Sequence, residues 1–354
     1  MREYFKTALK NLPLLLATAC AAVLIVALPG YSSAGVKRGL IICATNAVPS
    51  LFPFCVVSAF FTRSGLCGCV GRFLERPTRF IFRLPGCAGG AVCMSFIAGY
   101  PVGAMLTSDL YSDGSISRMD AQRMTLFCVN AGPAFVIGTV GAGMLGSIGA
   151  GIILFFSLTA SSLLLGVLTR FIPQGEETAE QMQRVKLRPV SQSLPEAVAD
   201  GTKSMISICA WIVLFSCALE YVPLLHLPDW ASLLLCCTAE VTGGCARAAG
   251  VLNIPAIAAV LGWGGVSVHC QVMRNVKACG TSLPHFVCAR LICAALAALF
   301  SAGLLKLFPG AVQTIALGSG GSPQLFSFSA PAAFAMLVSG ALLILELDTG
   351  KKKC

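Results

Sequence analysis

Charged residues are scarce in this sequence. Only 11% of the 354 residues are Asp, Glu, Lys or Arg, whereas soluble globular proteins carry about 25%. Stretches such as 11–36, 39–62 and 124–169 contain none of them. A spanning helix needs roughly 20 apolar residues, so several of these stretches are long enough to cross a bilayer. The scarcity of charge excludes an ordinary soluble domain, and the length of the apolar runs excludes a β-barrel, whose strands are short and alternate.

Motifs that carry chemistry are also missing. The sequence has no HExxH, no GxSxG and no convincing pair of aspartates in a helix, so we expect no enzyme. Its 18 cysteines form no CxxC, and nearly all lie in apolar stretches, where a free thiol behaves as a small buried hydrophobe. We therefore expect no metal site and no cofactor. No nucleic-acid-binding pattern is present, and the net charge of +10 is typical of basic cytoplasmic loops.

The apolar segments allow two topologies. If every segment crosses the membrane, the chain has ten helices; if 87–106 and 231–250 are re-entrant, it has eight. Loop 170–203 is rich in Lys and Arg, whereas loop 220–229 holds Glu and Asp with neither. Because basic loops tend to be cytoplasmic, we prefer the re-entrant topology, which places the first loop inside and the second outside. It also places the N-terminus and the Lys351–Lys353 tail in the cytoplasm.

The predicted fold class is an all-α polytopic membrane protein with about eight transmembrane helices plus two re-entrant hairpins in an inverted repeat. We expect it in the cell membrane, in contact with the lipid bilayer. The predicted spans are about 12–30, 40–62, 124–146, 149–170, 204–224, 254–272, 286–308 and 329–347. The predicted domains are an N-terminal transmembrane helix at 1–39, a first repeat at 40–170, a cytoplasmic linker at 171–203, a second repeat at 204–308, and a C-terminal helix with a basic tail at 309–354.

The stretch SFIAGYPVGAMLTSDLYSDG breaks a helix at membrane depth. Pro101 removes a backbone donor and disfavours helix at Tyr100, while Gly99 and Gly103 permit unusual dihedrals and close packing. Irregular backbone inside a bilayer is tolerated only where protein or a water-filled cavity surrounds it. We therefore predict a hairpin tip whose free backbone groups face something polar. The alternatives are a kinked helix or a glycine face packed against a neighbouring helix.

Three more apolar segments are interrupted by polar residues. Ionisable groups at membrane depth are costly and usually functional, which makes Glu240 the most informative side chain. Its structural alternatives are an ion pair with Arg247 or a position nearer the surface. Along a helix, Ser267 and Gln271 share a face and His269 points elsewhere. The candidate binding residues are Gly99, Tyr100, Pro101, Gly103, Asn130, Glu240, Thr242, Gly243, Ser267, His269 and Gln271.

Several of these stretches together resemble the sporulation integral membrane protein YlbJ family. They are LFPFCVVSAFF at 51–61, AGYPVGAMLTSDLY at 98–111, FCVNAGPAFVIGTVGAGMLG at 127–146, AEVTGG at 239–244 and LGWGGVSVHCQV at 261–272. The family is part of the wider group of nucleoside-recognition or Gate domain membrane proteins. The resemblance implies a role in forming the cortex or envelope of endospores. It also implies a substrate site where two opposed hairpins meet two broken helices, at Gly99–Gly103, Asn130, Glu240–Gly244 and Ser267–Gln271.

The sequence is compatible with two functions. The first is a transporter or permease for a small polar, nucleoside-like solute, in which Glu240 takes a proton or Na⁺ as coupling ion. The second is a non-transporting scaffold for spore envelope assembly, whose partners are other sporulation membrane proteins. Loop 171–203 mixes both charge signs with three prolines, so we expect it to be flexible and available to such partners.

Overall fold

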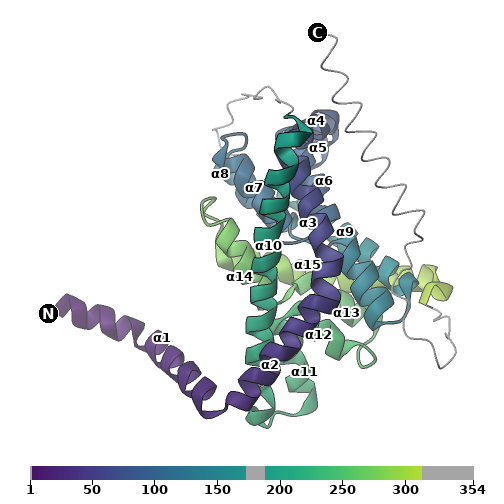
Figure 1. The fold of residues 1–354 in the computed structure, drawn as a ribbon. Helices are drawn as coiled ribbons and strands as arrows, with labels where there is room; N and C mark the ends of the chain where they lie inside the picture. The colour runs from purple at the N-terminus through teal and green to yellow at the C-terminus, as the bar shows by residue number, and fades with distance from the viewer. Residues whose placement is uncertain (1, 173–187, 313–354) are drawn as a thin grey trace.

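The structure is a computed structural model that describes residues 2–172 and 188–312, and this part of the chain is helical with no strand. Five helical stretches within it are long and apolar enough to cross a membrane: Pro29–Arg63, Ile148–Thr169, Val190–Leu225, Ile254–Asn275 and Leu283–Leu307. The predicted all-α polytopic membrane class is therefore confirmed. The predicted span 12–30 covers the second half of α1 (Arg2–Ala27) and runs past its end at Leu28. Helix α1 projects away from the body of the molecule (Figure 1). The predicted span 329–347 and the basic tail lie outside the described residues.

Two long antiparallel helices run the length of the molecule (Figure 1). The first consists of α2 (Pro29–Ile42), the π-helix η1 (Cys43–Ala47) and α3 (Val48–Arg63), and the second is α10 (Val190–Leu219). A Cβ atom built on Gly35 would lie 2.6 Å from the Cα of Cys217. One built on Gly201 would lie 3.0 Å from the backbone nitrogen of Val56. Small residues thus let the two backbones approach closely, as is usual between membrane helices.

Both helices of this pair begin earlier than the predicted spans 40–62 and 204–224, at Pro29 and at Val190. Charged residues in the added turns form ion pairs across the two helices. Arg38, expected in a loop, lies 3.0 Å from the Glu220 carboxylate. At the other end, Arg63 Nε donates to Asp200 at 2.8 Å. The helical backbone thus continues through residues that a hydropathy pattern assigns to loops.

Both predicted re-entrant segments are helical hairpins. The first consists of α6 (Ala88–Ala98) and α7 (Val102–Ser112), and the second of α11 (Asp229–Ala239) and α12 (Val241–Ala248). The arms fold back on each other, because a Cβ on Gly103 would lie 2.8 Å from Ser95 Cβ, and one on Gly244 would lie 2.7 Å from Cys237 Cα. The topology with ten straight helices is therefore wrong. Figure 1 shows the hairpins entering from opposite ends of the α3–α10 pair, with α4 and α5 at one end and α11 at the other.

Two further helices are interrupted in the middle, as predicted. One consists of α8 (Arg118–Phe127) and the π-helix η2 (Ala134–Met144), separated by residues 128–133. The other consists of α13 (Ile254–Trp263) and α14 (Gly265–Asn275). Gly264 and Gly265, at this second break, have φ of 82° and 79°. Glycine adopts this left-handed region without steric penalty, which is why the helix can end and restart there.

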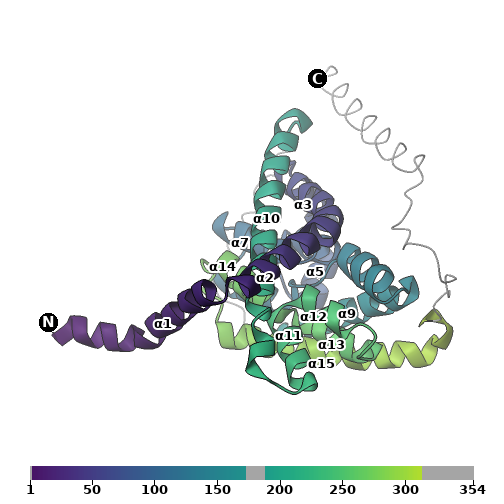
Figure 2. The same ribbon diagram turned by 60° about the horizontal axis from the view of Figure 1, so that its bottom comes forward.

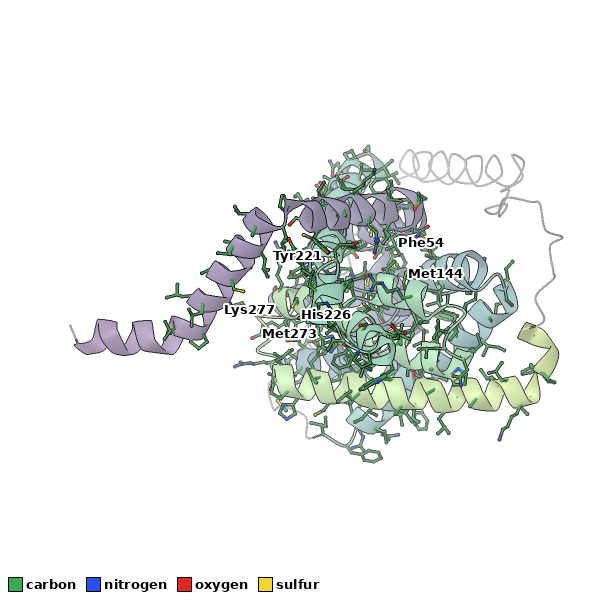
Figure 3. The ribbon with its side chains drawn as sticks, turned by 90° about the horizontal axis from the view of Figure 1, so that it is seen from below. Phe54, Met144, Tyr221, His226, Met273 and Lys277 are labelled. Carbon is green, nitrogen blue, oxygen red and sulfur yellow. The ribbon has the colours of Figure 1, made fainter. Side chains whose placement is uncertain are left out.

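The plain helices α9 (Ile148–Thr169) and α15 (Leu283–Leu307) pack beside the broken ones. Figure 2 shows α11, α12 and α13 gathered next to α15, and in Figure 3 α15 runs along one side of the bundle. A Cβ on Gly262 would lie 2.7 Å from Ala294 Cα, so α13 and α15 are in close contact. The remaining short elements are α4 (Leu66–Phe73), α5 (Glu75–Phe82), η3 (Val222–Leu225) and η4 (Pro309–Val312).

Candidate functional site

The tip of the first hairpin lies against the first helix break. Gly99 has a φ of 78°, and a Cβ atom at this position would lie 2.6 Å from the backbone nitrogen of Gly132. A Cβ on Gly103 would lie 1.8 Å from the carbonyl oxygen of Cys128. Real Cβ atoms do not approach other atoms this closely, so only glycine fits at either position. The hairpin tip therefore contacts the break through backbone rather than through side chains.

The tip of the second hairpin lies against the second break in the same way. A Cβ on Gly265 would lie 3.0 Å from the backbone nitrogen of Val241, and Trp263 Nε1 donates to the Thr238 carbonyl at 2.9 Å. The Tyr100 ring, from the first tip, lies 3.9 Å from the Cβ position of Gly264. Two hairpin tips and two helix breaks therefore meet in one region, as the sequence predicts.

A cavity occupies this meeting point. About 40 Å³ is open to the centres of water-sized molecules, which is room for a few waters at roughly 10–15 Å³ each. Its walls come from both hairpins, both broken helices and the α3–α10 pair, and no lysine or arginine of the described chain lines it. The polar lining residues are Asn46, Tyr100, Thr139, Glu240, Thr242, Ser267 and Gln271, and the apolar ones include Leu51, Phe135, Ile208 and Ile212.

Glu240 lines the cavity and also caps a helix. Its side chain is buried, with one carboxylate oxygen 2.9 Å from the Thr242 N–H and the other 2.6 Å from the Gly243 N–H. These are the free donors at the start of α12, where the helix dipole favours a negative charge. The alternative of an ion pair with Arg247 is wrong, because that guanidinium donates to Cys236 Sγ at 2.9 Å. Each carboxylate oxygen keeps lone pairs for a further donor in the cavity.

Most other polar groups of the cavity have no protein partner in the described part of the chain. The side chains of Asn46, Thr139, Ser267 and Gln271 form no hydrogen bond there, and the hydroxyl of Tyr100 is likewise unpaired. Ser267 and Gln271 are 1% and 7% exposed, so bulk water does not solvate them fully. Buried polar groups are nearly always hydrogen-bonded, because leaving them unpaired costs free energy. These side chains therefore have the capacity to bind water or a polar solute.

Two lining residues lie in π-helical segments. Asn46 belongs to η1 and Thr139 belongs to η2. The π-helix is rare and is frequently found at functional sites, because it re-aims the side chains that follow it. Neither residue is among the sequence-based candidates, since no residue pattern distinguishes a π-helical turn from the α-helix around it. Their convergence on the cavity supports its functional role independently of Glu240.

Five predicted binding residues do not line the cavity, and two of them, Asn130 and His269, have polar side chains that are bound elsewhere. Asn130 donates to the Phe127 carbonyl at 2.9 Å and accepts a hydrogen bond from Ser162, so it holds the first break against α9. His269 packs on the Trp263 ring, with centroids 4.2 Å apart, and its Nδ1 lies 2.7 Å from the Gly265 carbonyl. The helical spacing thus correctly separates His269 from the face shared by Ser267 and Gln271.

The other predicted residues contribute in different ways. Gly99, Tyr100 and Thr242 line the cavity. Pro101 precedes α7 and is not a lining residue. Gly103 makes the close approach to Cys128, and the Gly243 N–H donates to Glu240. Pro101, Gly103 and Gly243 thus contribute to the site through the geometry of the backbone.

Sequence reasoning missed the buried charge next to the two helix breaks, Arg290. It lies in α15 and is 2% exposed. Its guanidinium donates to the carbonyl of Val129 at 2.5 Å and to that of Gly262. The available signal was an arginine inside the predicted span 286–308, since an ionisable residue in a membrane helix is a functional candidate by default.

These features define a polytopic α-helical membrane protein with two helical hairpins that meet two broken helices at a polar cavity. The chain is similar to the sporulation integral membrane protein YlbJ of Bacillus subtilis (strain 168), with 28% identity over 226 residues. The alignment covers 58% of this chain and 55% of the relative, so it spans about half of that protein's length. The resemblance to the YlbJ family is thereby confirmed. No protein-family model and no solved structure matches the chain.

Proposed function

We propose that the protein is a multi-pass membrane protein of endospore formation that moves a small polar solute through the cavity between its hairpin tips. The involvement in sporulation rests on the similarity to YlbJ, a sporulation integral membrane protein. The transport role rests on one observation, namely the cavity whose polar side chains mostly lack partners in the described part of the chain. Broken helices and opposed hairpins that converge near the midplane are a common plan for secondary transporters.

The lining favours a small solute that donates hydrogen bonds. Glu240 supplies a carboxylate, and Ser267, Thr139 and the amides of Asn46 and Gln271 supply both donors and acceptors. With no arginine or lysine in the described lining, an anionic solute would meet no compensating charge. A nucleoside-sized solute needs a pocket of roughly 300 Å³ or more, so it would require the hairpins to move apart. Glu240 is the group that would take a coupling proton.

A flux measurement on the purified protein in liposomes tests this proposal. Stopped-flow light scattering would follow the entry of urea, glycerol, ribose and uridine, a size series of neutral polar solutes. We expect saturable flux for at least one of them. Gln271→Leu and Ser267→Ala should reduce it severalfold, because each removes a cavity hydrogen bond worth about 1 kcal/mol.

Ser301→Ala is the matched control for Ser267→Ala. Both serines are buried in membrane helices, but Ser301 does not line the cavity. Equal flux in all three variants and the unmodified protein, or the absence of saturable flux for every solute, would refute the transport role.

The second candidate function is a non-transporting scaffold for spore envelope assembly. It predicts that cavity variants support normal sporulation and that deletion of the protein does not. It also predicts that other sporulation membrane proteins co-purify through the predicted linker 171–203, of which residues 190–203 form the start of α10. Residues 173–187 of that linker lie outside the described residues. Complementation of a deletion strain with Gln271→Leu separates the two functions, because only the transporter loses sporulation when its cavity is blocked.

A further inference from the structure

Arg290 holds the two helix breaks together. It lies in the eighth position of α15, about 10 Å along the helix from its start at 1.5 Å per residue. Its side chain is buried, and its two terminal nitrogens donate to carbonyls on different elements. One is the carbonyl of Val129, in the first break, at 2.5 Å; the other is that of Gly262, at the second break.

The Gly262 carbonyl lies in the last turn of the half-helix α13, and the Val129 carbonyl lies in the unwound segment directly after the half-helix α8. Helix α8 ends at Phe127, two residues before Val129, and α13 ends at Trp263, one residue after Gly262. The C-terminal end of a helix carries a partial negative charge, because its last carbonyls have no intrahelical donor. Two such ends that converge inside a membrane form a cation-binding arrangement, and in transporters with broken helices unwound carbonyls and half-helix ends coordinate Na⁺.

No carboxylate neutralises Arg290 among the described residues, since every ion pair found there involves other arginines or Lys203. A buried charge without a counter-ion is costly unless dipoles replace its hydration shell. Here the two converging helix ends supply those dipoles. The planar guanidinium suits this geometry, because its fork can donate to two separate acceptors, whereas an ammonium is a single point charge.

We propose that Arg290 is a resident cation, which holds the two half-helix ends together in the position where a transporter of this plan would bind a metal ion. The inference rests on the proposed function, and it specifies that solute movement through the cavity does not require Na⁺. Glu240 complements it, since that carboxylate neutralises the opposite, positive end of α12. The chain's own side chains thus balance helix ends of both signs around the cavity.

Thermal unfolding of the purified full-length protein tests this inference without any flux measurement. The midpoint would be measured in NaCl and in choline chloride at equal ionic strength, for the unmodified protein, Arg290→Ala and Arg290→Lys. Arg274→Ala is the matched control, because Arg274 is exposed at the end of α14. Methylguanidinium chloride and methylammonium chloride would then be added to each protein at equal low concentrations.

We expect the unmodified protein and Arg274→Ala to unfold at the same temperature in Na⁺ and in choline. Arg290→Ala should unfold several degrees earlier, with methylguanidinium restoring at least half of the loss and methylammonium less. The unfolding midpoint of Arg290→Lys should lie between those of the unmodified protein and Arg290→Ala. It can still be measured if Arg290→Ala does not fold. A Na⁺-specific rise in the midpoint of the unmodified protein would overturn the inference, as would failure of methylguanidinium to stabilise Arg290→Ala, or an Arg290→Lys midpoint equal to that of the unmodified protein. Loss of the transport proposal alone would leave these midpoints unchanged.

Discussion

Glu240→Gln is expected to reduce solute flux at least tenfold while the protein stays folded. The substitution removes the negative charge of the cavity, and hydrogen bonds to a charged group are worth about 1.5–3 kcal/mol, which corresponds to tenfold or more. Glutamine keeps one oxygen that can accept from the Thr242 or Gly243 N–H, so part of the α12 cap survives. Flux in liposomes and the midpoint of thermal unfolding, measured on the same preparation, separate the two effects.

Glu196→Gln is the control for Glu240→Gln. Glu196 is a half-exposed residue of α10, 3.8 Å from Arg63, and surface ion pairs contribute at most about 1 kcal/mol. Its loss should leave flux within a factor of about two, in line with so small an energy. If Glu240→Gln transports as fast as the unmodified protein, Glu240 serves only to cap α12, and its assignment to solute or ion binding is wrong.

Gly103→Ala is expected to disrupt the first hairpin. The new methyl group would lie 1.8 Å from the Cys128 carbonyl oxygen and 2.8 Å from Ser95 Cβ, so backbone must move to accommodate it. Overpacking of a core costs about 1–3 kcal/mol, and a clash with backbone lies at the upper end of that range. For a chain of 354 residues, a loss of about 3 kcal/mol corresponds to a fall in Tm on the order of 4 °C. Thermal unfolding in detergent measures this fall.

Gly138→Ala provides the comparison for Gly103→Ala. Gly138 lies in η2, has a negative φ, and a Cβ built on it would meet no atom within 4 Å. The same substitution in a membrane helix should therefore leave the Tm unchanged at this position. Equal Tm values for the two variants would show that the first hairpin does not pack against the first break as described.

The irregular backbone was the most predictable part of the structure. Pro101 with Gly99 and Gly103 indicated the first hairpin tip, because a proline and two glycines cannot continue a membrane helix without protein around it. The glycine cluster before Ser267 indicated the second break, and the spacing of Ser267 and Gln271 placed both on the cavity side. In each case a local steric property of the residue determines the backbone structure. The sequence therefore predicts this structure without knowledge of the neighbouring helices.

Tertiary pairing explains what the sequence could not show. The hydropathy pattern places Arg38 and Asp200 in loops, yet both lie in helices, where they pair with Glu220 and Arg63. The sequence predicts that Asn130 binds a solute, but its amide oxygen accepts a hydrogen bond from Ser162 on another helix. Hydropathy and periodicity describe one segment at a time. They do not reveal which polar residue will find a partner on a distant helix and which will remain free for a ligand.

The side from which each hairpin enters the membrane tests the central claim most directly. Single cysteines at Ser112, at the end of the first hairpin, and at Leu227, before the second, would be introduced into a cysteine-depleted chain and labelled in intact cells with a membrane-impermeant maleimide. Both positions are exposed. Opposed hairpins predict that Leu227→Cys is labelled from outside and that Ser112→Cys is labelled only after the membrane is permeabilised. Labelling of both from the same side would contradict the opposed arrangement and with it the shared cavity.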